Sequence, residues 1–599
     1  MQEGKLCQLK TFKRLAALLA TAVLIGALPH VAPVGVHGSA AIAETTDSGT
    51  DNCEQTYDVS SGSGSAAAYQ SGNTCFVAFK NTGAVNTTAV MSWTLPSGVQ
   101  RVDVLVVGGG GGGGAHVGAG GGAGGLLSLT DESVSGASVA IEVGAGGRGA
   151  DSQVGSDISR ASGTTGIAYS GEASKFGSNT ADGGGHGGFW WNDNGSGLNG
   201  AAANGGSGGG AVERSTGTTS GGTASGNGSG NDGGQAGGGG SAGANGYLTG
   251  GGGGASAPGQ DANHDSDVLK SGDGGAGQSV SWISASAATA LTIGETSGDN
   301  VYFAGGGGGG FHDILATGGA GSGGLGGGGD GAGPPDGGAS DHRVIGSHGI
   351  ATTGGGGGGS GAPSTGTNHS TGGDGGSGVV LVSFVVPSSP AISSAPSSSS
   401  VDAGQTATFS VISSVSDGGT LSYQWQQSTD SGSTWSNVSG ATSASYTTPT
   451  LDATDSGDQF RVVARNTLGG NYAEATSSAA ILTVSRVSQT VTWAQPASLV
   501  LANSGDSATT ATSSGDGSIS YSLVNAGSTG CAINSSTGVL TFSGTGTCSV
   551  RADAAQTNTY DAASTTVSVT ITQGTFAVSG PSSKVGTSSS SFTSVCTSS

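Results

Sequence analysis

The stretch DVLVVGGGGGGGAHVGAGGGAGG, residues 103–125, places an apolar strand directly before a block of glycines. Many nucleotide-binding sites begin in this way. A phosphate-binding P-loop, however, closes its glycines with Lys and then Ser or Thr, and a dinucleotide fold uses them to open a helix. Here no lysine after residue 43 follows a glycine, and Gly114 is followed by more glycine, which costs a helix about 1 kcal/mol per residue. The stretch therefore does not predict a nucleotide site.

The N-terminus carries the parts of a secretory signal peptide. A basic segment at residues 5–14 precedes an apolar segment at residues 15–28, and Ala41-Ile42-Ala43 forms a small-x-small cleavage site. We expect residues 1–43 to be removed and the protein to be secreted or held at the cell surface. Since no later run of about 20 apolar residues exists, no membrane span is expected.

The charge balance limits the partners. The formal net charge is −22, although only 9% of the residues are charged. An acidic chain is repelled by nucleic acid and by anionic membranes, so neither is an expected partner. A cation such as calcium remains compatible with this charge.

The cysteine spacing fits an exported protein. We predict two disulfides, Cys53–Cys75 and Cys531–Cys548, each closing a short loop worth about 3 kcal/mol in the chain-entropy model. Cys596 remains without a predicted partner. Residues 574–599 resemble the opening strand of a further domain, which is expected to be truncated.

Residues 108–378 hold most of the 125 glycines of the chain. Collagen requires a strict Gly-X-Y period and far more proline, and a flexible linker would not be interrupted by apolar strands. Interruptions are present, and we predict strands at four of them: residues 138–143, 279–283, 290–293 and 300–304. A further strand ends the region at residues 376–386. A polyglycine-II helix has three residues per turn and no internal hydrogen bonds, so its amides need partners elsewhere. We predict packed polyglycine-II helices whose ends are fixed by strands.

A resemblance supports this prediction. TLPSGVQRVDVLVVGGGGGGG at residues 94–114 and GGDGGSGVVLVSF at residues 372–384 resemble the glycine-rich domain of secreted bacterial, often actinobacterial, surface proteins. The region, roughly residues 50–386, is also similar to glycine-rich modules of phage tail-tip adhesins and of a vertebrate receptor-kinase ectodomain. The resemblance implies polyglycine-II helices held by or near a β-sandwich.

Two further sandwiches are expected after the glycine region. Trp425 in SYQWQ and the segment DSGDQFRVV, residues 455–463, resemble bacterial immunoglobulin-like domains, in which a tryptophan packs between the sheets. Here Phe460 replaces the tyrosine and Val462 replaces the cysteine, so neither the tyrosine-corner hydrogen bond nor the inter-sheet disulfide is expected. Residues 486–573 resemble another bacterial immunoglobulin-like repeat.

The predicted fold is therefore mainly β. It comprises a β-sandwich scaffold with an inserted polyglycine-II-like region, followed by immunoglobulin-like sandwiches. The predicted boundaries are a signal peptide at residues 1–43, a glycine-rich domain at 44–387, immunoglobulin-like domains at 388–485 and 486–573, and the start of a further domain at 574–599.

Three sets of residues could carry chemistry. The segment DANHDSD offers Asp261, Asn263, Asp265 and Asp267 as calcium ligands, but the spacing of a helix-loop-helix site is absent, so a solvated acidic loop is the preferred interpretation. The histidines are scattered and are predicted to be solvated. Aromatic and histidine side chains beside glycine runs could stack on a sugar or fill a recognition pocket, or they could cover the bundle instead. These residues are Phe189, Trp190, Trp191, Phe311 and His312.

The function expected from these features is that of a non-catalytic extracellular or cell-surface structural or adhesion protein, not an enzyme. A cell-surface glycan or protein is the expected partner. GxSxG matches at residues 205–209 and 239–243 are attributed to the glycine content, and no cofactor other than calcium is considered. Two alternatives remain: an accessory part of a secreted enzyme whose catalytic domain lies beyond residue 599, and an ice-binding protein.

Overall fold

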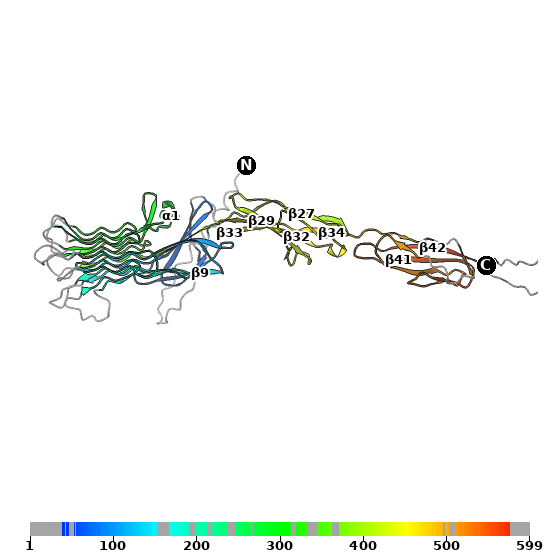
Figure 1. Ribbon diagram of the computed structural model, residues 1–599, viewed down its shortest axis with the longest axis horizontal. Coiled ribbons are helices and arrows are strands. Elements are labelled where there is room, and N and C mark those ends of the chain that lie inside the picture. The colour runs from blue at the N-terminus through cyan, green and yellow to red at the C-terminus, as the bar shows by residue number, and fades with distance from the viewer. Residues whose placement is uncertain are drawn as a thin grey trace, which may run out of the picture.

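The structure is a computed structural model of the chain and is mainly β. It describes residues 39–41, 43–46, 53, 56–152, 167–190, 199–212, 219–236, 247–265, 268–312, 319–333, 344–361, 370–494, 498–501 and 510–575. Figure 1 shows an elongated molecule in which a bundle of extended runs, a β-sandwich and two smaller sandwiches follow one another along the long axis. Within the described residues, no helix has the length and apolarity needed to cross a membrane.

Two six-stranded sheets form the first sandwich. The outer sheet has the order β1 (Ser39–Ala41), β3 (Thr56–Ser61), β6 (Ala89–Thr94), β9 (Ser138–Val143), β11 (Ser174–Phe176) and β12 (Asn179–Ala181). The central sheet has the order β2 (Ala43–Thr46), β4 (Gly64–Ser71), β5 (Thr74–Asn81), β24 (Val379–Val385), β7 (Arg101–Val107) and β8 (Leu126–Ser133). Strands β1 and β2 flank residue 42, within the predicted cleavage site. Cleavage at this site remains a prediction.

Strand β24 explains how a long glycine-rich excursion stays attached to the sandwich. The chain leaves the central sheet at the end of β7 and, after several returns to the scaffold, comes back to pair with β7 itself, with Val382 opposite Val104. On its other side β24 pairs with β5, with Val382 opposite Val77. The strands predicted at both ends of the glycine region are therefore neighbours in one sheet.

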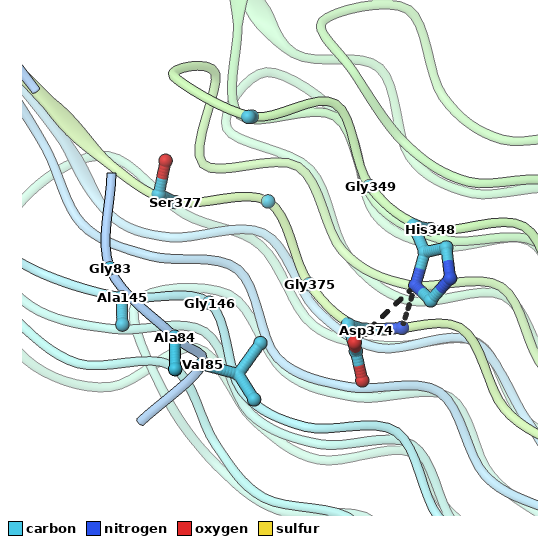
Figure 2. Close-up of a pocket in the computed structure, with 12 residues that line it drawn as sticks. Gly83, Ala84, Val85, Ala145, Gly146, His348, Gly349, Asp374, Gly375 and Ser377 are labelled. Carbon is cyan, nitrogen blue, oxygen red and sulfur yellow. Dashed lines mark hydrogen bonds and ion pairs between the residues drawn. The ribbon is translucent and has the colours of Figure 1, made fainter. Parts of the chain in front are cut away.

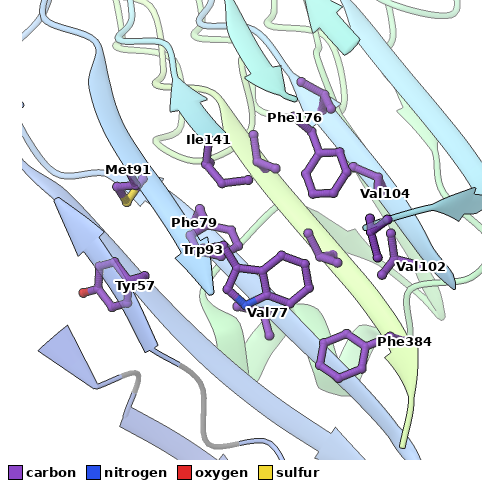
Figure 3. Packing of buried hydrophobic residues seen from close by; sticks show 14 of the residues in the cluster. Tyr57, Val77, Phe79, Met91, Trp93, Val102, Val104, Ile141, Phe176 and Phe384 are labelled. Carbon is purple, nitrogen blue, oxygen red and sulfur yellow. The ribbon is translucent and has the colours of Figure 1, made fainter. Parts of the chain in front are cut away.

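The core between the two sheets is built from alternating inward side chains (Figure 3). Trp93 is fully buried, and its ring lies 6.2 Å from that of Phe79 and 5.7 Å from that of Phe384, measured between centroids. The predicted Cys53–Cys75 disulfide is present and is also fully buried in this cluster. This aromatic core joins β6, β5 and β24 and so stabilises the strands that anchor the glycine runs.

The second face of the central sheet is also buried. Leu105 and Leu381 pack there against α1 (Ala285–Leu291) and against the sheet of β18 (Gln278–Ser279), β20 (Asn300–Phe303) and β19 (Glu295–Ser297). Lys80 donates its Nζ proton to the carbonyl of Leu291, at the end of α1. Because both faces of β24 are buried, nearly all of its residues are apolar.

Two of the strand predictions in this layer were wrong. Residues 279–283 contribute only Ser279 to a strand, and residues 290–293 begin with the last two residues of α1. Ser284 begins this helix, because its hydroxyl accepts the N–H of Ala287, and the following ASAATAL is rich in the good helix former alanine. The strands predicted at residues 138–143 and 300–304 are present as β9 and β20.

The glycine runs have the hydrogen-bond period of polyglycine II. Gly108, Gly111 and Gly114 donate to the run 118–125, Gly109 and Gly112 to the run 167–173, and Gly110 and Gly113 to the run 372–378. Every third residue thus faces the same neighbour, as a helix with three residues per turn requires. Bonds also close between three runs: Gly111 donates to Gly122, Gly121 to Gly357, and Gly357 to Gly111, at 2.8–2.9 Å.

The packing of these runs leaves no room for side chains. A Cβ atom at Gly111 would lie 2.5 Å from the carbonyl carbon of Gly185, and one at Gly110 would lie 2.9 Å from the carbonyl oxygen of Gly354. Both obstacles are backbone atoms, which cannot rotate away. The core of the bundle is therefore backbone, and glycine is required there by space.

Aspartates satisfy amides at the edge of the bundle. Six of them accept a neighbouring run's N–H at 2.6–2.8 Å: Asp182, Asp232, Asp261, Asp273, Asp330 and Asp374. Glu295 likewise accepts from Gly326 and Gly327. Since an outer run lacks a neighbour on one side, a carboxylate takes the place of a carbonyl acceptor.

The second sandwich has one large sheet and two small ones. The large sheet contains β26 (Ser399–Asp402), β34 (Ala480–Ser485), β32 (Gln459–Leu468), β29 (Thr420–Ser428) and β30 (Ser436–Asn437), with β33 (Asn471–Thr476) also paired to β32. The small sheets pair β25 (Ala391–Ser394) with β28 (Ile412–Ser414) and β27 (Thr408–Ser410) with β31 (Ser445–Thr447). A short 3-10 helix, η1 (Ala453–Asp455), precedes β32.

Its core confirms the immunoglobulin-like packing expected from the sequence. Trp425 is fully buried, and Phe460, in the position of the usual tyrosine, is 2% exposed. The Phe460 ring stacks on Phe409 with centroids 4.8 Å apart. Stacking inside the core replaces the tyrosine-corner hydrogen bond.

The third sandwich is smaller. Its main sheet has the order β36 (Leu499–Val500), β42 (Ala563–Thr572), β41 (Gly546–Ala554) and β38 (Ile519–Asn525). Two further pairs are β35 (Val491–Thr492) with β37 (Thr512–Ser513) and β39 (Ala532–Ile533) with β40 (Leu540–Thr541). The predicted Cys531–Cys548 disulfide is present, whereas Cys596 lies outside the described residues.

The carboxylate of Asp417 fixes the segment that leads into the second sandwich through hydrogen bonds to Ser388 and Asn466. Asp417 accepts the N–H of Ser388 at 2.6 Å and both oxygens lie within 2.9 Å of the Asn466 amide nitrogen. Burial alone would raise the pKa of Asp417, but the hydrogen bonds from Ser388, Asn466 and Gly419 outweigh it and lower the pKa to about 2.

Replacing Asp417 by Asn should destabilise this sandwich in a pH-dependent manner. Because the folded-state pKa lies below the unfolded value of 3.8, the carboxylate contributes its full stability above 3.8 and loses it as the pH falls through about 2. The stability difference between wild type and Asp417→Asn, measured by urea unfolding from neutral pH down to about 2, should therefore shrink on acidification. Asp402→Asn, an exposed control, should show no such change. A stability difference between wild type and Asp417→Asn that grows in acid would contradict this role of the Asp417 carboxylate.

Candidate functional site at the far end of the glycine bundle

The runs leave the sandwich, reverse at the opposite end of the bundle and return (Figure 1). We call this opposite end the far end. Its described residues comprise the turn at residues 114–118 and several short strand pairs. These are β13 (Phe189–Trp190) with β14 (Asn199–Gly200), β15 (Tyr247–Leu248) with β21 (Phe311–His312), β16 (Asn263–Asp265) with β17 (Val268–Lys270), and β10 (Asp151–Ser152) with β23 (Ser370–Thr371) and β22 (Val344–Ile345).

The turn at residues 114–118 is strained. His116 and Val117 have φ angles of 62° and 68°, a region that a β-branched residue such as valine rarely adopts. Two serine hydroxyls, those of Ser360 and Ser370, accept the N–H of His116 at 3.0 Å, and Val117 is 2% exposed. The surrounding runs therefore hold this turn in its unfavourable conformation.

Buried hydroxyl groups close the ends of the glycine runs. The Thr249 hydroxyl shares its one proton between the carbonyl groups of Gly310 (2.9 Å) and Gly118 (3.2 Å), and the Ser271 hydroxyl donates to Gly310 at 2.7 Å. Ser360 is also fully buried. A hydroxyl can accept and donate, so it satisfies backbone groups where a run ends. These residues were not predicted, although Thr249 directly precedes a glycine run and Ser360 directly follows one.

The residues predicted for recognition divide into buried and accessible ones. Phe311 is 3% exposed, whereas His312 is half-buried and its ring lies 6.0 Å from that of Tyr247 at 70°. Phe189 is half-buried, and its ring occupies the space where a Cβ atom at Gly200 would lie. The backbone of Trp190 pairs with Asn199, and Trp191 lies outside the described residues. Tyr247 also belongs to the accessible residues but was not predicted. It is far from His312 in sequence, and only the pairing of β15 with β21 brings the two together.

Two histidines differ from the prediction that they are solvated. Burial lowers the pKa of His116, and the charge of the nearby His312 lowers it further. Burial also lowers the pKa of His186, although its contact with the Gly187 carbonyl acts in the opposite direction. Burial therefore favours the neutral form of both rings.

The predicted calcium ligands do not converge as far as the structure describes them. Asp261 caps the amide of Gln235, Asn263 pairs with Lys270, Asp265 pairs with Val268, and Asp267 lies outside the described residues. Within the described ranges, no three His, Cys, Asp or Glu side chains are grouped as a metal site requires.

An open pocket of about 280 Å³ lies beside the bundle, between residues 83–85 and the runs around residues 348 and 375 (Figure 2). Its ionisable side chains are His348 and Asp374. The Asp374 N–H donates to His348 Nδ1 at 2.9 Å, and Asp374 Oδ1 accepts the N–H of Gly149. Nδ1 and Asp374 Oδ2 are also 3.5 Å apart, a pair that needs a protonated Nδ1 and so competes with that amide bond. His348 and Asp374 therefore bond to each other and to the backbone of Gly149.

A family model described as a glycine-rich domain matches residues 84–385, just over half of the chain. The chain belongs to this glycine-rich domain family. The matched region covers most of the first sandwich and the whole bundle, so the far end is part of the glycine-rich domain. A second model, described as a domain of unknown function (DUF8696), matches residues 392–486, which form the second sandwich. A search of curated proteins finds no relative.

Solved structures with similarity to this chain contain two domains in tandem. The titin domains Z1Z2 in complex with telethonin share 18% identity, over 31% of this chain and 98% of theirs, with a TM-score of 0.20. The Ig1-2 module of Drosophila receptor protein tyrosine phosphatase DLAR shares 16%, over 31% and 100%, with a TM-score of 0.13. Human protocadherin-24 EC1-2 shares 14%, over 30% and 97%, with a TM-score of 0.16. At such TM-scores, these similarities carry no conclusion about function.

Proposed function

We propose that this protein is a non-catalytic extracellular or cell-surface adhesion protein whose glycine-rich domain binds its partner through the far end of the bundle. The observation that carries the proposal is the distribution of side chains. Packed glycine runs offer only backbone, whereas Tyr247, His312 and Phe189 are partly accessible where those runs end. Aromatic rings suit a glycan or a protein surface.

The position of the far end supports the same proposal. The second and third sandwiches lie beyond the first sandwich, on the side opposite to the bundle, so they would act as spacers (Figure 1). The two disulfides are consistent with an oxidising, extracellular location. We also propose that the protein is secreted through the signal peptide at residues 1–43. Its proposed origin is bacterial, of the actinobacterial type.

Binding should depend on the accessible residues of the far end and not on their buried neighbours. We expect Tyr247→Ala and His312→Ala each to weaken binding about tenfold or more, since loss of a hot-spot side chain costs about 2 kcal/mol or more. Phe311→Ala should instead lower thermal stability, because its ring is buried. The measurement is binding of the full chain to panels of immobilised glycans and extracellular proteins, together with the melting temperature.

Tyr302→Ala is the matched control, because Tyr302 is also a half-buried tyrosine but lies on β20 beside the sandwich. It should bind as wild type does. If the two far-end variants bind as tightly as wild type, or if all four variants lose binding only in proportion to their folded fraction, the far end is not the binding site.

A further inference from the structure

A hairpin of the second sandwich reaches the glycine-rich domain. Strands β32 and β33 are joined by Gly469 and Gly470, whose φ angles of 56° and 77° are typical of the tight hairpin turn that requires two left-handed residues. Gly470 lies against the side chain of Arg101, since a Cβ there would come within 2.7 Å of Arg101 Cγ. A Cβ atom at Gly469 would lie 3.2 Å from Cγ2 of Val385. The turn therefore inserts at the end of the first sandwich that faces away from the bundle.

Asn471, the residue after this turn, uses its whole hydrogen-bonding capacity on the glycine-rich domain. Its Oδ1 accepts the N–H groups of Gln100 and Arg101, both at 2.8 Å. Its Nδ2 donates to the carbonyls of Arg101 and Val385, both at 3.0 Å. The residue is 1% exposed, so none of these four bonds competes with bulk water.

The strands that Asn471 joins are those that bound the glycine excursion. Arg101 begins β7, from which the first glycine run leaves, and Val385 ends β24, to which the last run returns. One side chain of the second sandwich thus holds the near ends of both strands. These strands are neighbours in the central sheet, so their separation matches the reach of a single amide.

The neighbouring backbone completes the contact. The N–H of Tyr472 donates to the carbonyl of Gly98 at 3.0 Å. Gly98 has a φ of 83°, and a Cβ atom there would lie 3.0 Å from the carbonyl carbon of Tyr472 and closer still to its oxygen. The first and second sandwiches therefore approach each other closely at positions occupied by glycine, Gly98 on one side and Gly469 and Gly470 on the other.

The connecting segment is fixed as well. Ser388 donates its N–H to Asp417, and its carbonyl accepts from the Asn466 side chain at 2.9 Å. Pro387 and Pro390 on either side restrict the φ angles of the connection. A flexible linker would show none of these features, since its backbone is bonded to water.

We infer that the domain of unknown function, residues 392–486, is a rigid mount for the glycine-rich domain, and that the turn at residues 469–472 is its docking element. The mount fixes the direction in which the bundle projects. This inference deepens the proposed function, but its test uses no ligand, so the two can fail independently.

The test is the distance between spin labels on the full chain, with Ser135→Cys in the first sandwich and Thr450→Cys in the second. Cys7→Ser and Cys596→Ser remove the competing thiols. Both labelled positions are exposed. We expect a single narrow distance distribution. Asn471→Asp should abolish it, because a carboxylate would face the carbonyl oxygens of Arg101 and Val385 in place of the amide group. Asn437→Asp, the same change at an exposed position of this domain, should leave the distribution narrow.

Gly98→Ala provides a second disruption from the other side of the contact and leaves the second sandwich unaltered. Near-ultraviolet circular dichroism reports whether each variant remains folded, and if Asn471→Asp does not fold, Gly98→Ala decides. A broad distribution in the unsubstituted labelled chain, or a narrow one in the folded disrupted variant, would overturn the inference.

Discussion

Gly111→Ala should lower the free energy of unfolding of the glycine-rich domain by about 3 kcal/mol, the upper part of the usual range for overpacking. The added Cβ would lie 2.5 Å from the carbonyl carbon of Gly185 and 2.9 Å from the carbonyl oxygen of Gly184. Relief would need the runs to separate, which would weaken bonds such as that from Gly111 to Gly122. Alanine also restricts the unfolded chain, but the stabilisation of about 0.4–1 kcal/mol from that effect is smaller.

Gly319→Ala is the matched control for this substitution. A Cβ atom at Gly319 meets no atom within 4 Å, and its φ is not in the left-handed region. The variant should be as stable as wild type or more stable by up to about 1 kcal/mol. Chemical unfolding of both variants gives the comparison. Equal stabilities for Gly111→Ala and Gly319→Ala would show that space between the runs does not determine stability.

Trp93→Ala should cost the first sandwich about 3–5 kcal/mol, because it leaves a cavity beside Phe79 and Phe384. The bundle should lose stability with it. Strands β5 and β24 carry those two phenylalanines, and β24 receives the last glycine run, so a weakened core releases the anchor of the bundle. Trp93→Ala should therefore reduce protection from proteolysis in both the sandwich and the glycine runs.

Trp425→Ala separates this coupled effect from a general loss of stability. Trp425 is equally buried but belongs to the core of the second sandwich. Its removal should unfold that domain and leave the glycine runs protected. Glycine runs that melt at the wild-type temperature in Trp93→Ala would show that the bundle is stable without its scaffold.

The ends of the glycine region could be predicted because they obey local rules. Apolar runs such as residues 101–107 and 379–385 identify strands from composition alone. That β24 inserts between β5 and β7 could not be predicted, since register depends on contacts far apart in sequence. The helix at residues 285–291 was missed because a short apolar stretch is ambiguous between helix and strand.

The far end was predicted less completely, for a physical reason. Its residues come together only when the runs pack: His116 approaches His312 across the bundle, and Thr249 bonds to Gly118 and Gly310. No local pattern encodes such contacts. A weak signal existed in the Ser and Thr residues that border glycine runs, because a run must end on groups that can satisfy its backbone.

The structure explains part of the excess of acidic residues in this chain. From the sequence, residues such as Asp261 were interpreted as solvated or as calcium ligands. In the bundle, Asp261 and five other aspartates accept amide hydrogens from outer runs. A carboxylate is a strong acceptor with a short side chain, so it can close an exposed edge that has no further glycine run.

Amide hydrogen exchange in residues 108–125 and 354–361 tests the central claim, that the glycine runs form a folded bundle with a backbone core. The amides of Gly111, Gly121 and Gly357 bond to one another's runs, and all three residues are buried. We predict that these amides exchange only through cooperative unfolding and are protected to a degree similar to the amides of β24. Exchange at the rate of an unstructured glycine linker, while β24 remains protected, would contradict the account.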